Sequence, residues 1–257
     1  MSEPISVGII GAAGRMGRMV AQGLHADGGF VVGALYDTAG GDIAGIGAIS
    51  TNLDELKKSS ATHILDFSLG QGVDAHGEDI LASGKQYIVG ATGYNEDTIA
   101  RLDTASLKHG VSCLIVPNFS IGANMMMEFS RLAAAFYDSV EIVERHHAGK
   151  ADAPSGTALN TANLIAGTKK MTAGPSAEKF SGVRGGDVHG IRVHSQRLPG
   201  VLAEQQVIFG AGGETLIIEH RTISRECYLP GIKLALRAMG TFKGLRIGLQ
   251  SVMEAQP

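Results

Sequence analysis

The densest group of chemically active side chains lies between residues 144 and 157. That segment reads Glu-Arg-His-His-Ala-Gly-Lys-Ala-Asp-Ala-Pro-Ser-Gly-Thr. Imidazole titrates near neutral pH, so His146 or His147 is a candidate proton donor. In an extended segment neighbouring side chains point to opposite sides, so the two rings are expected to have different roles. No metal site is expected, because adjacent histidines rarely share one ion and the cationic Lys150 lies close by.

The end of this segment has the pattern of a helix start. Ser155 is a candidate N-cap, and Gly156 and Thr157 would then offer unpaired backbone N–H groups. A positive helix end with Lys150 and His147 nearby suits a small substrate that carries two carboxylates. Arg184 and Arg225 are further candidates for binding a carboxylate, or equally for surface ion pairs.

A second group of residues predicts a dinucleotide site near the N-terminus. It directly follows the apolar run 5–10 and reads Gly11-Ala12-Ala13-Gly14-Arg15-Met16-Gly17. A turn from a strand into a helix aims backbone N–H groups at a pyrophosphate, and glycines let the phosphates approach. Asp37 closes the next apolar run, where an acid would bind the ribose hydroxyls.

Asp37 also bears on the choice of cofactor. A carboxylate there repels a 2′-phosphate, and residue 38 is Thr rather than Arg, so NADH is favoured over NADPH. Arg15 could still contact a 2′-phosphate. Two later segments follow strand ends, where ligands of open parallel sheets bind, and are candidates for the nicotinamide pocket. They are Gly90-Ala91-Thr92-Gly93 and Val116-Pro117-Asn118-Phe119.

The composition is that of a globular α/β enzyme. The chain has 257 residues, 44% of them apolar and 18% charged, which excludes wholesale disorder. A net charge of −3 and few aromatic residues speak against nucleic-acid binding. Two cysteines make no disulfide framework, and no signal peptide or membrane-spanning run is found. We therefore expect a cytoplasmic protein without nucleic-acid or membrane partners.

Alternating apolar runs and helical segments predict a Rossmann-type, doubly wound parallel sheet in the first part of the chain. Strands are expected over 5–10, 30–36, 62–67, 87–91 and 111–116, with helices over 15–25, 72–83 and 96–108. The isolated histidines His25, His63, His76 and His109 are expected at the surface.

After residue 119 the pattern changes to a second, α+β domain with a mixed or antiparallel sheet. Helices are expected over 123–137, 155–169 and 231–239, and strands over 140–145, 188–195, 204–209 and 214–220. We expect a dinucleotide-binding domain over 1–118 and a substrate-binding domain over 119–228.

Motifs along most of the chain resemble those of the 4-hydroxy-tetrahydrodipicolinate reductase family. They are the Gly-Arg-Met-Gly turn, Asp66-Phe67-Ser68, Gly90 to Gly93, Asn118-Phe119-Ser120, and the segment from His146-His147 to Gly156-Thr157. The last motif is the most specific. The resemblance implies an NAD(P)H-dependent reduction of 4-hydroxy-tetrahydrodipicolinate to tetrahydrodipicolinate in diaminopimelate and lysine synthesis.

The resemblance also implies roles for particular residues. The family's NAD(P) contacts fall on residues 11–17, Asp37, Gly90-Ala91-Thr92 and Val116 to Phe119. Its proton donor falls on His146, its second catalytic group on Lys150, and its substrate contacts on His147, Gly156 and Thr157. Enzymes of this family are typically homotetramers assembled through the second domain, and their C-terminal helix returns to the first domain. The resemblance therefore implies that 119–228 is also the oligomerisation domain and that 229–257 returns to the dinucleotide-binding domain.

Four positions depart from the family pattern. Ala91 stands where Thr is common, Pro117 replaces Ala and removes a backbone donor, Gln205 replaces His, and Tyr228 replaces Phe. None of them is the proposed acid or Lys150, so they bear on cofactor contacts and assembly rather than on the reaction.

Two other functions are compatible with parts of the pattern. Another two-domain nicotinamide enzyme, such as an amino-acid dehydrogenase, would share the first domain but is not expected to carry the His-His-x-x-Lys cluster. A protein that only senses NAD would bind the cofactor without turnover and would have no use for the residues from His146 to Thr157.

Overall fold

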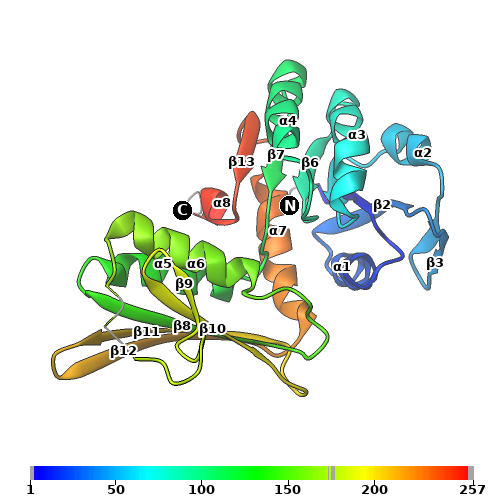
Figure 1. The fold of residues 1–257 in the computed structure, drawn as a ribbon. Coiled ribbons are helices and arrows are strands. Elements are labelled where there is room, and N and C mark those ends of the chain that lie inside the picture. Colours follow the sequence, from blue (N-terminus) through cyan, green and yellow to red (C-terminus); the bar gives the residue numbers. More distant parts are fainter. Residues whose placement is uncertain (1–2, 173, 175–176, 254–257) are drawn as a thin grey trace. The chain divides into compact units, whose positions relative to one another are not determined.

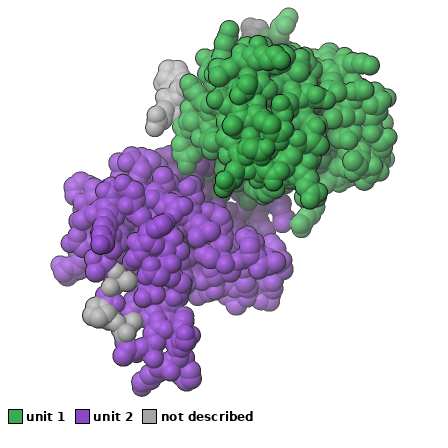
Figure 2. Space-filling model, turned by 45° about the horizontal axis from the view of Figure 1, so that its top comes forward, with its two compact units in different colours: residues 1–120, 228–257 green, residues 121–227 purple. Residues whose placement is uncertain are grey.

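The computed structural model describes residues 3–172, 174 and 177–253. It divides the chain into two compact units, which are described one at a time (Figure 2). Unit 1 comprises residues 1–120 and 228–257, and unit 2 comprises residues 121–227.

Unit 1 is built on a six-stranded parallel sheet with strand order β13-β7-β6-β5-β1-β2 (Figure 1). Its strands are β1 (Ile5–Ile10), β2 (Phe30–Tyr36), β5 (His63–Asp66), β6 (Gln86–Val89), β7 (Ser112–Ile115) and β13 (Gly244–Ile247). The chain moves from β1 to β2 in one direction and from β5 to β7 in the other. Ligands of such sheets bind at the carboxyl ends of the strands beside this reversal. The expected doubly wound parallel sheet is therefore confirmed.

Helices connect these strands and bury the sheet. They are α1 (Arg15–His25), α2 (Leu53–Lys58), α3 (Gly70–Ala82), α4 (Glu96–His109), α7 (Leu229–Ala238) and α8 (Gln250–Met253). Helix α3 packs against α4, and α1 packs against α7. Right-handed crossovers in the two opposite directions place such helix pairs on opposite faces of the sheet. Ile64, Tyr87 and Cys113, which are fully buried, form part of the core beneath α3 and α4.

Several short elements of unit 1 were not predicted from the sequence. They are α2, the hairpin of β3 (Gly41–Ile43) and β4 (Gly47–Ile49), strand β13 and helix α8. Each has only three to six residues, too few for a clear periodic pattern. Strand β13 matters most, because it pairs with β7 and completes the sheet with residues from beyond unit 2.

Unit 2 contains a five-stranded mixed sheet with strand order β12-β11-β8-β10-β9. The strands are β8 (Ser139–His146), β9 (Gly186–Val188), β10 (Ile191–Arg197), β11 (Ala203–Ala211) and β12 (Glu214–Thr222). Strand β10 runs parallel to β8, and the other pairs are antiparallel. The run predicted as one strand over 188–195 is split between β9 and β10 by the tight turn at His189 and Gly190.

One face of this sheet is covered by α5 (Ile121–Ala134) and α6 (Gly156–Thr168), which lie side by side (Figure 1). Along β8 alternate side chains face the helices, and Val140, Ile142 and Glu144 are the buried ones. The charged Glu144 thus occupies a position where the strand period calls for an apolar residue. A short 3₁₀ helix, Arg225–Tyr228, leads back to unit 1.

Within the described part of the chain, no helix is both long enough and apolar enough to cross a membrane.

Candidate active site

The glycine-rich turn predicted to hold a pyrophosphate joins β1 to α1. Gly11 has φ +77°, and a Cβ there would lie 2.8 Å from the carbonyl group of Phe67. A Cβ on Gly17 would overlap the carbonyl oxygen of Gly11 and lie 2.7 Å from Cα of Ala12. Helix α1 begins after Gly14 with no side-chain cap, so its first N–H groups are available to an anion. The rest of the turn lies at or near the surface: Ala13 and Met16 are half-buried, and Gly14 and Arg15 are exposed.

Asp37 lies where the sequence placed it, directly after β2 and beside this turn. One carboxylate oxygen accepts the N–H of Ala13 at 3.0 Å, and the other accepts the N–H of Ala39 at 2.9 Å. The carboxylate is therefore held against the glycine turn by backbone donors. Thr38 next to it is exposed and carries no charge.

The two loops predicted at the nicotinamide follow β6 and β7. A Cβ on Gly90 would lie 2.7 Å from the Phe67 ring and 2.9 Å from the Phe119 ring. These two rings meet edge to face with centroids 5.9 Å apart. The Asn118 side-chain oxygen accepts the N–H of Ser120 at 2.9 Å. Within the two loops Ala91 and Val116 are buried, whereas Thr92 and Pro117 are exposed.

All of these segments gather at one edge of the unit 1 sheet, because β1, β5, β6 and β7 are parallel neighbours and their carboxyl ends meet there. A bound dinucleotide requires three features that are present here. They are backbone N–H groups at a helix start, glycines that admit no side chain, and an acid after β2. The residues present therefore fit a nicotinamide dinucleotide.

A buried polar group lies beneath this edge, and the sequence motif that contains it gave no indication of its role. Asp66, the last residue of β5, is fully buried and accepts hydrogen bonds from Ser68 N–H (2.8 Å), His76 Nε2 (2.6 Å) and Tyr87 OH (2.5 Å). Burial raises the pKa of Asp66, but the hydrogen bonds from His76, Ser68 and Tyr87 outweigh it and lower the pKa overall. The expected surface position of His76 is thus wrong. His63 is also half-buried, and burial lowers its pKa to about 4.

The candidate catalytic cluster of unit 2 is organised around Glu144, whose side chain has no exposed surface. Its Oε2 lies 2.6 Å from Nδ1 of His146 and accepts Nη1 of Arg197 at 2.9 Å. Its Oε1 accepts Nη2 of Arg197 at 3.0 Å and the N–H of Ser155 at 3.2 Å. Burial raises the pKa of Glu144, but the hydrogen bonds from Arg197, Ser195 and His146 lower it overall. Glu144 is therefore ionised at neutral pH.

His146 ends β8, and its side chain is 17% exposed. It lies two residues after Glu144 on the same side of the strand, which brings Nδ1 to the carboxylate and leaves Nε2 for a substrate. Burial lowers the pKa of His146, and Lys150 and Arg197 lower it further, while Glu144 opposes them. His147 follows the strand, and its N–H donates to the carbonyl of Leu202.

The loop from His147 to Pro154 carries Lys150 and leads to the start of α6. Lys150 Nζ contacts both carboxylate oxygens of Asp152, at 2.7 and 2.8 Å. Ser155 caps α6 by accepting the N–H of Ala158 at 3.2 Å, as the sequence predicted. Gly156 and Thr157 are the first two residues of the helix. The structure therefore brings the helix start and His146 to opposite sides of one buried carboxylate.

The two arginines that are candidates for carboxylate binding from the sequence are not part of this cluster. Arg184 pairs with Glu141 at 2.5 Å, and Glu141 also contacts His194. Arg225 lies in the 3₁₀ helix that leads out of unit 2. The arginine at the site is Arg197, at the end of β10, for which no local pattern in the sequence was found.

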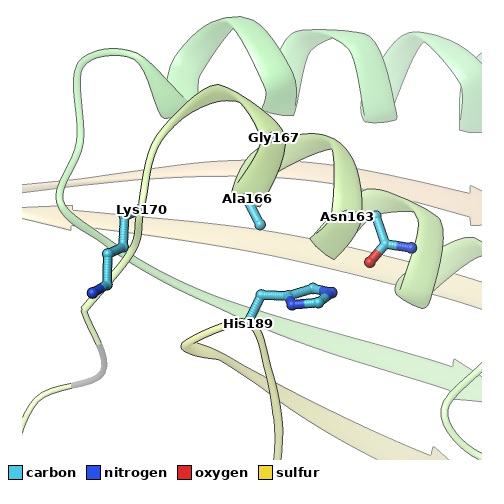
Figure 3. A pocket seen from close by; sticks show the side chains of 5 residues that line it. All are labelled: Asn163, Ala166, Gly167, Lys170 and His189. Atoms are coloured by element: carbon cyan, nitrogen blue, oxygen red, sulfur yellow. The ribbon is translucent and has the colours of Figure 1, made fainter.

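A shallow hollow of about 620 Å³ lies at the other end of α6 (Figure 3). It is lined by Asn163, Ala166, Gly167, Lys170 and His189. His189 and Gly190 have φ +55° and +83°, as a two-residue hairpin turn requires. Asn163, the lining residue nearest to Ser155 along α6, lies eight residues from it, about 12 Å along the helix, and the hollow is not part of the cluster around Glu144.

Comparisons with known proteins cover both units. A family model described as dihydrodipicolinate reductase, N-terminus, matches residues 5–119, and one described as its C-terminus matches residues 122–253. Proteins named 4-hydroxy-tetrahydrodipicolinate reductase from Synechococcus elongatus and Desulfitobacterium hafniense are 37% and 39% identical to this chain. Each alignment covers 98% of this chain and 100% of the relative. A solved structure, dipicolinate-bound dihydrodipicolinate reductase from Paenisporosarcina sp. TG-14, has TM-score 0.87 and 28% identity over 97% of this chain and 100% of that one.

Proposed function

This chain belongs to the dihydrodipicolinate reductase family, and we propose that it reduces 4-hydroxy-tetrahydrodipicolinate to tetrahydrodipicolinate with NAD(P)H. The observation that carries the proposal is the cluster of His146, Lys150 and the start of α6 around the buried carboxylate of Glu144. We place the reaction in diaminopimelate and lysine synthesis, in the cytoplasm.

Unit 1 is proposed to bind the cofactor through residues 11–17, Asp37, Gly90-Ala91-Thr92 and Val116 to Phe119. The bound nicotinamide supplies a hydride. Asp37 favours NADH, since its carboxylate would lie by the adenosine ribose and repel a 2′-phosphate. In the Asp37→Ser variant the ratio of kcat/KM for NADH to that for NADPH should fall. An unchanged ratio would show that Asp37 does not select the cofactor.

His146 is proposed as the proton donor. Because Glu144 is ionised, Nδ1 of His146 carries a proton and donates to it, and Nε2 is the nitrogen that can act on substrate. The substrate first loses its 4-hydroxyl group as water, which gives a ring carbon conjugated to the imine. Hydride adds to that carbon, the electron pair moves toward the ring nitrogen, and the resulting enamine takes its proton from His146 at carbon.

Lys150 and the start of α6 are proposed to hold the substrate and its developing charge. Lys150 would stabilise negative charge near the ring nitrogen, on exchanging its contact with Asp152 for the substrate. His147 and the N–H groups of Gly156 and Thr157 would bind carboxylates, since a helix start attracts anions.

The uncovered face of the unit 2 sheet is proposed as the surface through which a homotetramer assembles. In the described part of unit 2, α5 and α6 cover one face of the sheet and no helix covers the other (Figure 1). Ile217 on that face is 55% exposed, beside Ile208 on β11. Light scattering of the parent should give the mass of four 26.7 kDa chains, and Ile217→Asp a smaller mass. A parent that is monomeric at assay concentration would contradict this proposal.

The reaction is tested by following cofactor oxidation at 340 nm, with the substrate made in situ from pyruvate and aspartate semialdehyde by a synthase. Rapid loss of NADH that His146→Ala abolishes is the expected result. Cofactor binding without turnover would favour a sensor, and turnover only with an amino acid and NAD⁺ would favour an amino-acid dehydrogenase.

A further inference from the structure

Glu144 is paired not only with His146 but also with Arg197, a cation that is not needed to orient the His146 ring. Nε of Arg197 donates to the carbonyl of Lys150 at 3.2 Å, and Nη2 donates to the carbonyl of Asp152 at 2.5 Å. The same guanidinium forms the two-pronged pair with Glu144. One side chain therefore ties the end of β10 to the buried carboxylate and to the loop that carries Lys150.

The charges that face His146 can be counted element by element. On its own strand lies Glu144, on β10 lies Arg197, and the following loop contributes Lys150 paired with Asp152. Strand β11 places the uncharged Ala203 opposite His146. Because Arg197 offsets Glu144 and Asp152 offsets Lys150, these four charges sum to zero.

A buried carboxylate without a cation would hold an imidazolium strongly, and a proton held strongly is released slowly to carbon. An imidazole without the carboxylate would have neither a fixed tautomer nor a counter-charge for its protonated form. Both partners are therefore needed if the ring is to be protonated and still give up its proton.

We propose that Glu144 and Arg197 act as a positioning pair for the proton donor. Glu144 fixes the Nδ1 proton, so that Nε2 is the nitrogen that delivers, and Arg197 offsets the carboxylate, so that the imidazolium can release its proton. This inference rests on the proposed function in naming His146 as the donor. The directions of the pKa effects agree, since Glu144 raises the pKa of His146 and Arg197 lowers it.

Two variants test the pair, and they should shift the pKa of His146 in opposite directions. Glu144→Gln keeps the shape and removes the negative charge, so the pKa of His146 should fall by about 1 unit or more. Arg197→Met removes the cation, so that pKa should rise by a similar amount. The pKa is measured on the folded enzyme without substrate, by NMR titration of the His146 ring, assigned with His146→Asn.

Arg145→Met is the matched control. Arg145 adjoins His146 in sequence but points to the other face of the sheet, where it bonds to Gln196 and Glu204. Its removal should leave the pKa of His146 unchanged. If Arg197→Met does not fold, Arg197→Lys replaces it. The more mobile ammonium cannot make the two-pronged pair, so the shift should have the same sign and be smaller.

Opposite shifts in the Glu144 and Arg197 variants, with none in Arg145→Met, support the pair. Shifts of the same sign, or no shift in variants that fold, would overturn it. The pH dependence of kcat/KM separates this inference from the proposed function. The pKa of the His146 ring could shift as expected while the pH dependence of kcat/KM stays unchanged. In that case the pair exists and His146 is not the proton donor.

Discussion

Each unit holds a fully buried carboxylate whose oxygen lies 2.6 Å from a histidine nitrogen, yet the two pairs have different surroundings. In unit 1 Asp66 meets His76, and its other donors are the neutral Tyr87 hydroxyl and a backbone N–H. In unit 2 Glu144 meets His146, and its other donors include the guanidinium of Arg197. The guanidinium offsets the negative charge that faces His146, and the proposed proton transfer depends on this difference.

The two pairs also support different kinds of site. Asp66 ends β5 and anchors Ser68, in the loop that packs against the glycine turn, so it supports backbone that would bind a cofactor. Glu144 supports the His146 side chain and the start of α6. The two pairs thus share a geometry and differ in the charge beside the carboxylate and in the part of the chain that each supports.

The largest expected effect separates the two histidines. His146→Ala should lower kcat by about 10²-fold or more, because the proton donor is lost, and leave NADH binding unchanged. His76→Ala is the matched variant and should leave kcat near the parent value, while the free energy of unfolding falls by about 3 kcal/mol. Steady-state kinetics and guanidinium unfolding measure both. Equal losses of kcat in the two variants would contradict the assignment of a catalytic role to His146 and a structural role to His76.

The next effect concerns the backbone site that Asp66 supports. Gly17→Ala places a Cβ against the Gly11 carbonyl and must displace the turn, so KM for NADH should rise about tenfold or more. In Gly14→Ala the new Cβ lies 3.2 Å from the same oxygen, and the change should be much smaller. If the two variants behave alike, the turn does not bind the cofactor through a close backbone approach.

A smaller effect isolates the neutral partner of Asp66. Tyr87→Phe removes one donor from a buried carboxylate and should lower the free energy of unfolding by about 1–3 kcal/mol without changing kcat. Denaturant unfolding followed by circular dichroism measures the first, and the 340 nm assay the second. A stability equal to that of the parent would mean that the hydroxyl contributes nothing to the pair.

The smallest expected effect is the change in the free energy of unfolding as the pH falls. The pKa values of Asp66 and Glu144 are both lowered on folding, from 3.8 and 4.5. The stability that each contributes is therefore complete above its ordinary pKa and is lost as pH falls through the lower, folded value. Each loss is at most about 1.4 kcal/mol per pH unit. Unfolding at pH 3 to 7 should show a flatter acid limb in Asp66→Asn and Glu144→Gln, and an unaltered limb would contradict this.

The parts of the site that the sequence could predict are local. Residues 11–17 and the segment from His146 to Thr157 are contiguous, and a strand-to-helix turn or a helix start determines their geometry. Asp37 was predictable because the end of β2 must lie beside the end of β1. The doubly wound sheet follows from the alternation of strands and helices.

The missed residues depend on pairings between distant segments. Arg197 reaches Glu144 across 53 positions only because β10 pairs with β8 in parallel, which sets Arg197 opposite His146. His76 lies on α3 and reaches Asp66 at the end of β5, and no pattern around His76 in the sequence indicates this contact. A register and a packing orientation are properties of the assembled chain rather than of a local pattern.

The chain leaves unit 1 at Ser120 and returns at Tyr228, and both points belong to one small region of that unit. A Cβ on Gly231 would overlap the carbonyl oxygen of Phe119, so the outgoing and returning backbones touch. Unit 2 is thus inserted between neighbouring points of unit 1. During synthesis on the ribosome, β13 emerges after the whole insertion, so the cofactor-binding sheet stays one strand short until unit 2 has been made. Unit 1 contains the first strand to be synthesised, β1, and also the last, β13, so it can be completed only after unit 2.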